Sequence, residues 1–501
     1  MKNSCLMIQG TASSVGKSLL CAALCRILKQ DGYRVAPFKA QNMALNSFVT
    51  YDGLEMGRAQ VMQAEAAGIE PLVEMNPVLL KPTSDQGSQV VVMGRPAGNM
   101  GALDYFSWKE NLWPVIDKAY QKLSKDHDII VIEGAGSPAE INLKESDLVN
   151  MGLAKRLKAP VLLVGDIDRG GVFASLYGTV ALLEEDERAL LKGVVINKFR
   201  GDPKVLEPGL EMLEKLIDLP VLGVLPMLKL QLDDEDSVTE RFTRSSGKGA
   251  LKVQVLLLPR IANFTDFNPF ELFDDVSLSY IREIKELADP DLLILPGSKN
   301  TIEDLLFLRE AGWEETLRQY AAAGGLLIGI CGGFQMLGRR IIDPHRVESS
   351  LLEIDGLGFL DFETVMEKDK STRQVEALWR YADDNYFSQQ GEELLKGYEI
   401  HMGRTDYGQV EHPLFIHSTG QDDGAINATG NVFGTYLHGL FDNLTWTANL
   451  LNAVRRRRNL PEKSNLLPAT YREYKEREYD SLAAVVRKSL DLKKIMHIIT
   501  D

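Results

Sequence analysis

The chain has 501 residues, of which 45% are hydrophobic and 25% are charged, and its formal net charge is −15. This length predicts about two or three domains, each able to bury its own core. The negative charge argues against a nucleic-acid-binding protein, which needs a basic face. It also means that an acidic substrate must be held by a local cationic pocket.

Cysteine usage and the lengths of the apolar runs indicate where the protein works. The four cysteines, Cys5, Cys21, Cys25 and Cys331, include no CxxC pair. They form neither a disulfide framework nor a zinc site, which favours the reducing cytoplasm. The N-terminal apolar run is too short for a signal peptide, and no run is long enough to cross a bilayer. We therefore expect a cytoplasmic protein without a membrane partner; no pattern in the residues predicts an oligomeric state.

Short apolar runs alternate with amphipathic segments through the first half of the chain. Runs such as CLMIQG, DIIVIEG and APVLLVGD are typical of buried parallel strands, and residues 18–30 and 174–183 have the pattern of helices. This alternation predicts a doubly wound α/β domain over residues 1–231.

A charged and then Ser/Gly-rich stretch without apolar periodicity predicts a linker over residues 232–250. The apolar runs that follow, including VQVLLLP, DLLILPG and LLIGICGG, predict a second α/β domain over residues 251–447. Residues 448–501 are rich in charge, as in RRRRN and EYKERE, and predict a solvated helical tail.

The stretch CLMIQGTASSVGKSLLCAAL predicts a strand, a glycine-bounded turn and a helix. Gly16, Lys17 and Ser18 close a phosphate-binding loop, in which backbone N–H groups face phosphate oxygens. Lys17 is expected to neutralise the β- and γ-phosphates of ATP, and the Ser18 hydroxyl to ligate Mg²⁺. The general pattern has glycine where Thr11 stands. The alternative is a glycine-rich turn with a surface lysine, but the flanking strand and helix favour nucleotide binding.

The spacing GTASSVGKS resembles dethiobiotin synthetase and its relatives, which phosphorylate a carboxylate-type oxygen. Partitioning ATPases of the ParA/MinD kind have a second lysine at the position of Ala12, so they match less well. The resemblance implies that Lys39 lies near the reacting phosphoryl group, that Glu133 holds Mg²⁺, and that Asn197 contacts adenine.

A further metal carboxylate is predicted from two candidates on the segment that follows the phosphate loop. These are Asp52 and Glu55, of which Glu55 is favoured.

The stretch LLIGICGGFQMLG raises the question of why an apolar strand ends at a thiol and turns at two glycines. A strand that delivers Cys331 to its end, followed at once by a helix, has the form of a nucleophile elbow. The turn exposes the sulfur, and the helix N-terminus lowers the pKa of such a thiol. The alternative is an inert buried cysteine.

Two distant segments favour the catalytic reading of Cys331. The strand DLLILPGS ends in Gly297 and Ser298, whose backbone N–H groups can form an oxyanion hole. Of seven histidines, His438 in TYLHGLF has the best context for a general base, and His401 is a pocket or structural residue.

The set PGS, CGGFQ and a late histidine resembles class I glutamine amidotransferases. The resemblance implies that Gly332 and Gln335 belong to the glutamine pocket. Relatives have a glutamate two residues after the histidine, where this chain has Leu440. Either another carboxylate orients His438, or the thiol and the imidazole act as a dyad.

Longer stretches resemble the glutamine amidotransferases of the cobalamin pathway; these include PFKAQNMALNSFVT, GDIDRGGVFASLYGT, LPRIANFTDFNP and GYEIHMGRT. The resemblance implies ATP- and glutamine-dependent amidation of the b, d, e and g carboxylates of a corrin polycarboxylate through acyl phosphates. The N-terminal motifs offer Gln41, Asn42, Arg58 and Lys81 as substrate contacts. The alternatives are the related enzyme that amidates the a and c carboxylates, and a regulatory ATPase that forms no amide.

Overall fold

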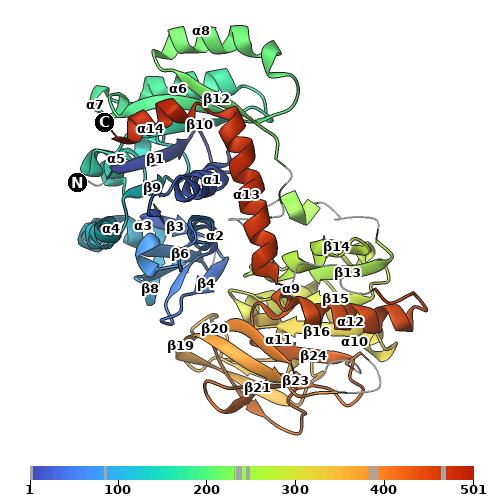
Figure 1. The fold of residues 1–501 in the computed structure, drawn as a ribbon. Coiled ribbons are helices and arrows are strands. Elements are labelled where there is room, and N and C mark those ends of the chain that lie inside the picture. The colour runs from blue at the N-terminus through green and yellow to red at the C-terminus, as the bar shows by residue number, and fades with distance from the viewer. Residues whose placement is uncertain are drawn as a thin grey trace.

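The structure is a computed structural model that describes residues 4–83, 87–228, 230, 232, 240–243, 249–382, 386–387, 393–463 and 470–500. It contains two α/β units. The second contacts the first through the chain's long hairpin, and the C-terminal helices pack on the first unit (Figure 1). Within the described ranges, no helix combines the length and the apolarity that a membrane crossing requires.

The first unit is built on a six-stranded parallel sheet of order β12-β11-β10-β1-β9-β2. Strand β1 lies in the middle of the sheet and pairs with β9 and β10, so the loop that follows it opens at the carboxyl edge. The strands are β1 (Ser4–Gly10), β2 (Val35–Phe38), β9 (Ile129–Glu133), β10 (Val161–Asp166), β11 (Leu191–Phe199) and β12 (Val221–Pro226).

Alternate side chains of β1 point to opposite faces of this sheet, as the strand repeat requires. Met7 packs with the helices of one face, whereas Leu6 and Ile8 pack with α1 on the other. The helices of the unit are α1 (Lys17–Gln30), α2 (Arg58–Ala67), α3 (Ala102–Trp108), α4 (Trp113–Asp126), α5 (Met151–Leu157), α6 (Val172–Leu182), α7 (Glu185–Arg188) and α8 (Glu207–Ile217), with short 3₁₀ segments η1 (Val73–Met75), η2 (Lys109–Leu112), η3 (Ile141–Ser146) and η4 (Pro203–Val205).

Two small sheets between β2 and α3 extend this doubly wound layer and were not predicted from the sequence. One has the order β3-β6-β7-β8 and the other pairs β4 with β5. Their strands are β3 (Gln41–Met43), β4 (Ser47–Val49), β5 (Glu55–Gly57), β6 (Val78–Pro82), β7 (Gly87–Val92) and β8 (Arg95–Gly101).

The second unit has a central sheet of order β14-β13-β15-β16-β24-β23, parallel except for the β23–β24 pair. Its strands are β13 (Leu251–Leu256), β14 (Val276–Ile281), β15 (Leu292–Leu295), β16 (Leu326–Ile330), β23 (Ala425–Ile426) and β24 (Val432–Thr435). Its helices are α9 (Thr301–Glu310), α10 (Trp313–Ala322), α11 (Gly332–Leu337) and α12 (Leu444–Arg457), with η5 (Glu240–Thr243), η6 (Phe264–Leu272), η7 (Ile284–Glu286) and η8 (Leu440–Asp442).

A long hairpin, β19 with β20, carries a further sheet whose order is β18-β17-β19-β21-β22. Residues 397–403, part of the GYEIHMGRT motif, lie in this hairpin and not in the central sheet. The strands are β17 (Arg340–Ile342), β18 (Glu353–Asp355), β19 (Phe362–Trp379), β20 (Leu394–Tyr407), β21 (Leu414–Ile416) and β22 (Gln421–Asp423).

The C-terminal segment differs from the solvated tail that its charges predicted. Helix α13 (Tyr471–Ser489) returns from the second unit to the first, and α14 (Leu492–Thr500) follows it there (Figure 1). Tyr479, Leu482 and Val486 of α13 are buried against α1. The buried Arg26 of α1 binds Glu476 at 2.6 Å and Asp480 at 2.8 Å. Some charged side chains of α13 therefore form ion pairs with the first unit, and the helix covers one face of the first sheet.

The two α/β units agree with the fold predicted from the alternating strands and helices. The predicted linker over residues 232–250 lies largely outside the described residues; 232, 240–243, 249 and 250 are the part of it that the structure describes.

Candidate active sites

The predicted phosphate loop lies between the central strand β1 and helix α1. Gly16, at the helix N-cap, has φ +97°, and a side chain there would meet the Asn197 amide at 2.1 Å. Asn197 donates to the Val15 carbonyl at 2.8 Å and its own oxygen accepts from the Lys198 N–H at 2.8 Å. Asn197 thus braces the loop in this structure, and its predicted contact with adenine stays a prediction.

Lys17 directs its ammonium group over the loop. Its Nζ donates to the carbonyls of Ala12 at 2.9 Å and Gly136 at 3.1 Å. The Thr11 N–H is used within the fold, where it donates to the Val164 carbonyl at 2.9 Å. The lysine therefore lies at the N-terminus of helix α1, an arrangement that suits binding of an anionic phosphate.

Glu133, at the end of β9, forms hydrogen bonds with two other predicted residues of this site. Its Oε1 accepts from the Ser18 hydroxyl and from the Lys39 ammonium, both at 2.9 Å. Gln63 and Gln60 of α2, which were not predicted from the sequence, donate to its Oε2 at 2.5 Å and 3.4 Å. No three or more His, Cys, Asp or Glu side chains of the described chain gather as a metal cage. A hydroxyl and one carboxylate beside a phosphate loop nevertheless fit Mg²⁺, which takes few protein ligands and completes its shell with phosphate and water.

Glu55 does not join this group. It is fully buried, and its two oxygens accept from Lys81 at 2.7 Å and from Lys370 of the second unit at 2.6 Å. Asp52, the other candidate, is exposed and accepts from the Thr50 hydroxyl at 2.5 Å. The structure therefore does not support the predicted metal role of Glu55, because two ammonium groups already occupy its carboxylate.

The four residues predicted to contact the substrate do not all lie at one site. Gln41 accepts from the Tyr105 hydroxyl, and Asn42 donates to Gln60 at 3.1 Å. Arg58 lies over the Phe48 ring at 5.3 Å from its centre. Lys81 lines the cavity around Cys331 instead. Asn42 is thus linked through Gln60 to the Glu133 group, whereas Lys81 belongs to the contact between the units.

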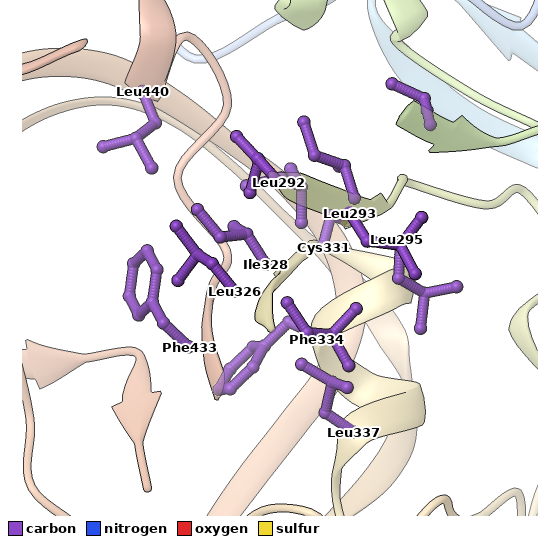
Figure 2. Packing of buried hydrophobic residues seen from close by; sticks show 14 of the residues in the cluster. Leu292, Leu293, Leu295, Leu326, Ile328, Cys331, Phe334, Leu337, Phe433 and Leu440 are labelled. Atoms are coloured by element: carbon purple, nitrogen blue, oxygen red, sulfur yellow. The ribbon is translucent and has the colours of Figure 1, made fainter. Parts of the chain in front are cut away.

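Cys331 lies at the turn between β16 and α11, among buried apolar side chains of β15, β16 and α11 (Figure 2). Its backbone has φ +51° and ψ −106°, a strained conformation for a residue with a side chain. The two glycines that follow permit close approach, since a Cβ at Gly332 would lie 2.8 Å from the Ser298 nitrogen and one at Gly333 would lie 1.9 Å from the Leu295 oxygen. The geometry is that of the predicted elbow.

The imidazole of His438 is held by a carboxylate that was not predicted from the sequence, that of Asp266. Its Nδ1 lies 2.7 Å from Asp266 Oδ2, and the Asp266 Oδ1 accepts from the Gly439 N–H at 3.2 Å. Burial lowers the pKa of His438, but the Asp266 carboxylate and the Cys331 sulfur raise it to about 10. His438 is therefore prepared to carry a proton beside Cys331, with Asp266 in place of the glutamate that is absent at Leu440.

The remaining predicted residues of the glutaminase site line the same cavity. Gly297, Ser298 and Gln335 border it with Cys331 and His438. Gln335 accepts from the Thr301 hydroxyl at 3.0 Å and donates to the Tyr436 hydroxyl at 3.3 Å. His401 also lines it and stacks on Tyr436 with ring centres 3.8 Å apart. The structure brings this predicted set together, with Gly332 packed against Ser298.

Residues 6–235 match the family described as the CobQ/CobB/MinD/ParA nucleotide binding domain, and residues 252–446 match the CobB/CobQ-like glutamine amidotransferase domain. The "Cobyric acid synthase" of Clostridium botulinum strain Loch Maree is 52% identical over 500 residues, which cover 99% of each chain. The chain belongs to the cobyric acid synthase family. Members from Thermoanaerobacter sp. strain X514 and Clostridium novyi are 51% and 49% identical, over 98% and 100% of this chain and 98% and 99% of their own.

Membership of the cobyric acid synthase family confirms the resemblance predicted from the sequence, including an amidotransferase with a nucleotide-binding unit and a glutaminase-type unit. The family also counts against the alternative of a regulatory ATPase that forms no amide.

Proposed function

We propose that this protein is a cobyric acid synthase that amidates the b, d, e and g carboxylates of adenosyl-cobyrinic acid a,c-diamide, with ATP and glutamine as co-substrates. The observation that carries the proposal is the buried set of Cys331, His438 and Asp266 on the second unit, beside a first unit with an ordered phosphate loop. The identity of the corrin substrate rests on the family.

Ammonia is released in the second unit. The Cys331 thiolate attacks the side-chain amide carbon of glutamine, and the backbone N–H groups near Ser298 and Gly332 stabilise the oxyanion. The His438 imidazolium protonates the departing nitrogen, so ammonia leaves and a glutamyl thioester remains on Cys331. Water, deprotonated by His438, then hydrolyses the thioester to glutamate. Asp266 keeps the imidazole oriented throughout.

Carboxylate activation occurs in the first unit. A carboxylate oxygen attacks the γ-phosphorus of ATP, which breaks the bond to ADP and gives an acyl phosphate. Lys17 and Lys39 neutralise the charge that develops on the transferred group. The Ser18 hydroxyl and the Glu133 carboxylate, which contact each other at 2.9 Å, are the residues that would hold Mg²⁺. When bound, Mg²⁺ supplies Lewis-acid stabilisation of the phosphate oxygens. Ammonia then attacks the acyl carbon and inorganic phosphate departs, leaving the amide.

The test is a time course with ATP, Mg²⁺, glutamine and the adenosylated a,c-diamide, followed by mass analysis of the corrinoid. We expect four successive amide products and one ATP consumed per amide. Cys331→Ala should lose the reaction with glutamine and keep it with ammonium salts, whereas Lys17→Met should lose both and keep glutamine hydrolysis. In a parallel assay with cobyrinic acid as the substrate, amidation confined to the a and c carboxylates would assign the related enzyme instead.

A further inference from the structure

The cavity around Cys331 contains charged side chains that the steps above do not use. Its lining includes Lys81, Lys299, Glu348 and Lys370. Two of the lysines, Lys81 and Lys370, are each bound to Glu55. Lys299 and Glu348 have no ion-pair partner within 4.0 Å among the described residues, although they line the same cavity.

We infer that Lys299 binds the α-carboxylate of glutamine and Glu348 binds its α-ammonium, so that this pair selects the zwitterionic end of the substrate. The inference rests on the proposed glutaminase reaction and adds to it the residues that decide which amides are accepted. Glutamine carries its scissile amide at one end and two opposite charges at the other. A cavity with a reactive sulfur, an available cation and an available anion matches all three groups.

The two charged residues lie on loops that are joined to each other by hydrogen bonds. Lys299 follows the predicted oxyanion segment, and the next residue, Asn300, donates to the Glu348 carbonyl at 2.8 Å. The Thr301 N–H donates to Glu348 Oε2 at 2.7 Å. Asp343 is fully buried and accepts from the N–H groups of Val347 and Glu348 at 2.7 Å and 2.9 Å, which fixes the second loop. The Glu348 carboxylate is therefore held beside the segment that carries Lys299 before any ligand arrives.

The electrostatics of the pair support binding of a ligand with both charges. Burial raises the pKa of Glu348 to about 7, against the opposing effects of Lys299 and of the hydrogen bonds from Thr301. Burial lowers the pKa of Lys299, and Glu348 offsets this effect in part. Each charge is thus incompletely compensated in the protein alone. An α-ammonium beside Glu348 and an α-carboxylate beside Lys299 supply the missing counter-charges.

The experiment compares three amides as substrates of glutaminase activity: glutamine, glutaramate, which lacks the α-ammonium, and 4-aminobutanamide, which lacks the α-carboxylate. Glu348→Gln should raise KM for glutamine about tenfold to a hundredfold, the effect of losing a charge-assisted hydrogen bond, and leave KM for glutaramate unchanged. Lys299→Met should raise KM for glutamine similarly and leave KM for 4-aminobutanamide unchanged. Lys285→Met and Glu353→Gln, which remove exposed charges of the same unit, serve as controls.

A second measurement guards against variants that fold poorly. Iodoacetamide alkylates Cys331 but has neither an α-ammonium nor an α-carboxylate group, so it reports the reactivity of the sulfur alone. The glutamine analogue 6-diazo-5-oxo-L-norleucine has both groups. The two site variants should slow inactivation by the analogue and not by iodoacetamide. Equal slowing by both reagents, or equal rises of KM for all three amides, would overturn the inference. A wild-type protein without glutaminase activity would instead refute the proposed function.

Discussion

At the scale of single residues, Asp266 is the feature that most changes the chemistry expected of the site. It reaches His438 from 172 residues earlier in the chain and forms a contact of 2.7 Å with Nδ1. Asn263, three residues before it, lies 3.5 Å from His438 Nε2 and accepts from the Ser47 N–H of the first unit. The imidazole is thus held from two sides, and one of its neighbours is bound to the other unit.

Asp266→Asn should narrow the pH range of glutamine hydrolysis. The Asp266 carboxylate raises the pKa of His438, so the imidazolium persists until the pH approaches about 10 and activity falls above it. Without that carboxylate the pKa falls, and the basic limb of the kcat/KM profile moves to lower pH. We also expect kcat to fall about a hundredfold or more, as for loss of general acid–base catalysis. Ammonium-driven synthesis is the control, and an unmoved basic limb contradicts this role.

At the scale of elements, the turn from β16 into α11 depends on two consecutive glycines. Gly333→Ala places a methyl group 1.9 Å from the Leu295 oxygen, so the backbone must shift. We expect a loss of about 1–3 kcal/mol, as for other overpacked sites, with a fall of the melting temperature and of glutaminase activity. Gly178→Ala in α6 is the matched control, because a Cβ there meets no atom of the described residues within 4 Å and alanine favours a helix interior. Equal melting temperatures of the two variants would contradict the packing argument.

Helix α13 is expected to stabilise the first unit through its apolar face. Leu482 is 1% exposed and packs in the cluster that contains α1, so Leu482→Ala should cost about 2–5 kcal/mol. The readout is amide hydrogen exchange, which should accelerate in β1 and α1. Leu216→Ala on α8 provides the control, since Leu216 is 65% exposed and should change little. An unchanged rate of amide hydrogen exchange in β1 would mean that α13 contacts the first unit without stabilising it.

At the scale of the whole molecule, a buried ion network joins the two units. Glu55 of β5 lies between Lys81 and Lys370, and Thr372 of β19 donates to the Gly53 carbonyl at 2.7 Å. Burial lowers the pKa of Lys370 to about 7, although Glu55 raises it in part. Glu55 is thus a counter-ion of the contact between the units.

Glu55→Gln should therefore lower stability without changing the metal requirement. Two buried ammonium groups would lose their shared counter-ion, at a cost of about 3–5 kcal/mol. The Mg²⁺ concentration for half-maximal synthesis should stay as in the wild type, whereas Glu133→Gln should raise it. A thermal melt and a Mg²⁺ titration on each variant separate the two roles. A higher Mg²⁺ requirement in Glu55→Gln with an unchanged melt would restore the metal role predicted from the sequence.

The sequence predicted those parts of the molecule whose signals are local. The β1 loop and the elbow at Cys331 each combine a strand, glycines and a helix within about twenty residues, a pattern that backbone geometry nearly determines. Asp266 and the pairing of Glu55 could not be predicted, because they depend on contacts between distant segments. Leu440 showed that the usual carboxylate was missing but not which residue replaced it. The charges of α13 wrongly predicted a solvated tail, because an amphipathic helix with many polar residues can still bury one face.

The return of α13 to the first unit has a consequence for biosynthesis. A ribosome makes the first sheet early, but α13 emerges only after the whole second unit has been translated. Residues of α1 such as Leu24 and Leu28, which pack in the cluster that α13 completes, stay partly uncovered during that interval. We therefore expect the glutaminase half to mature first on the nascent chain, and the nucleotide-binding half to reach its final stability only near the end of translation.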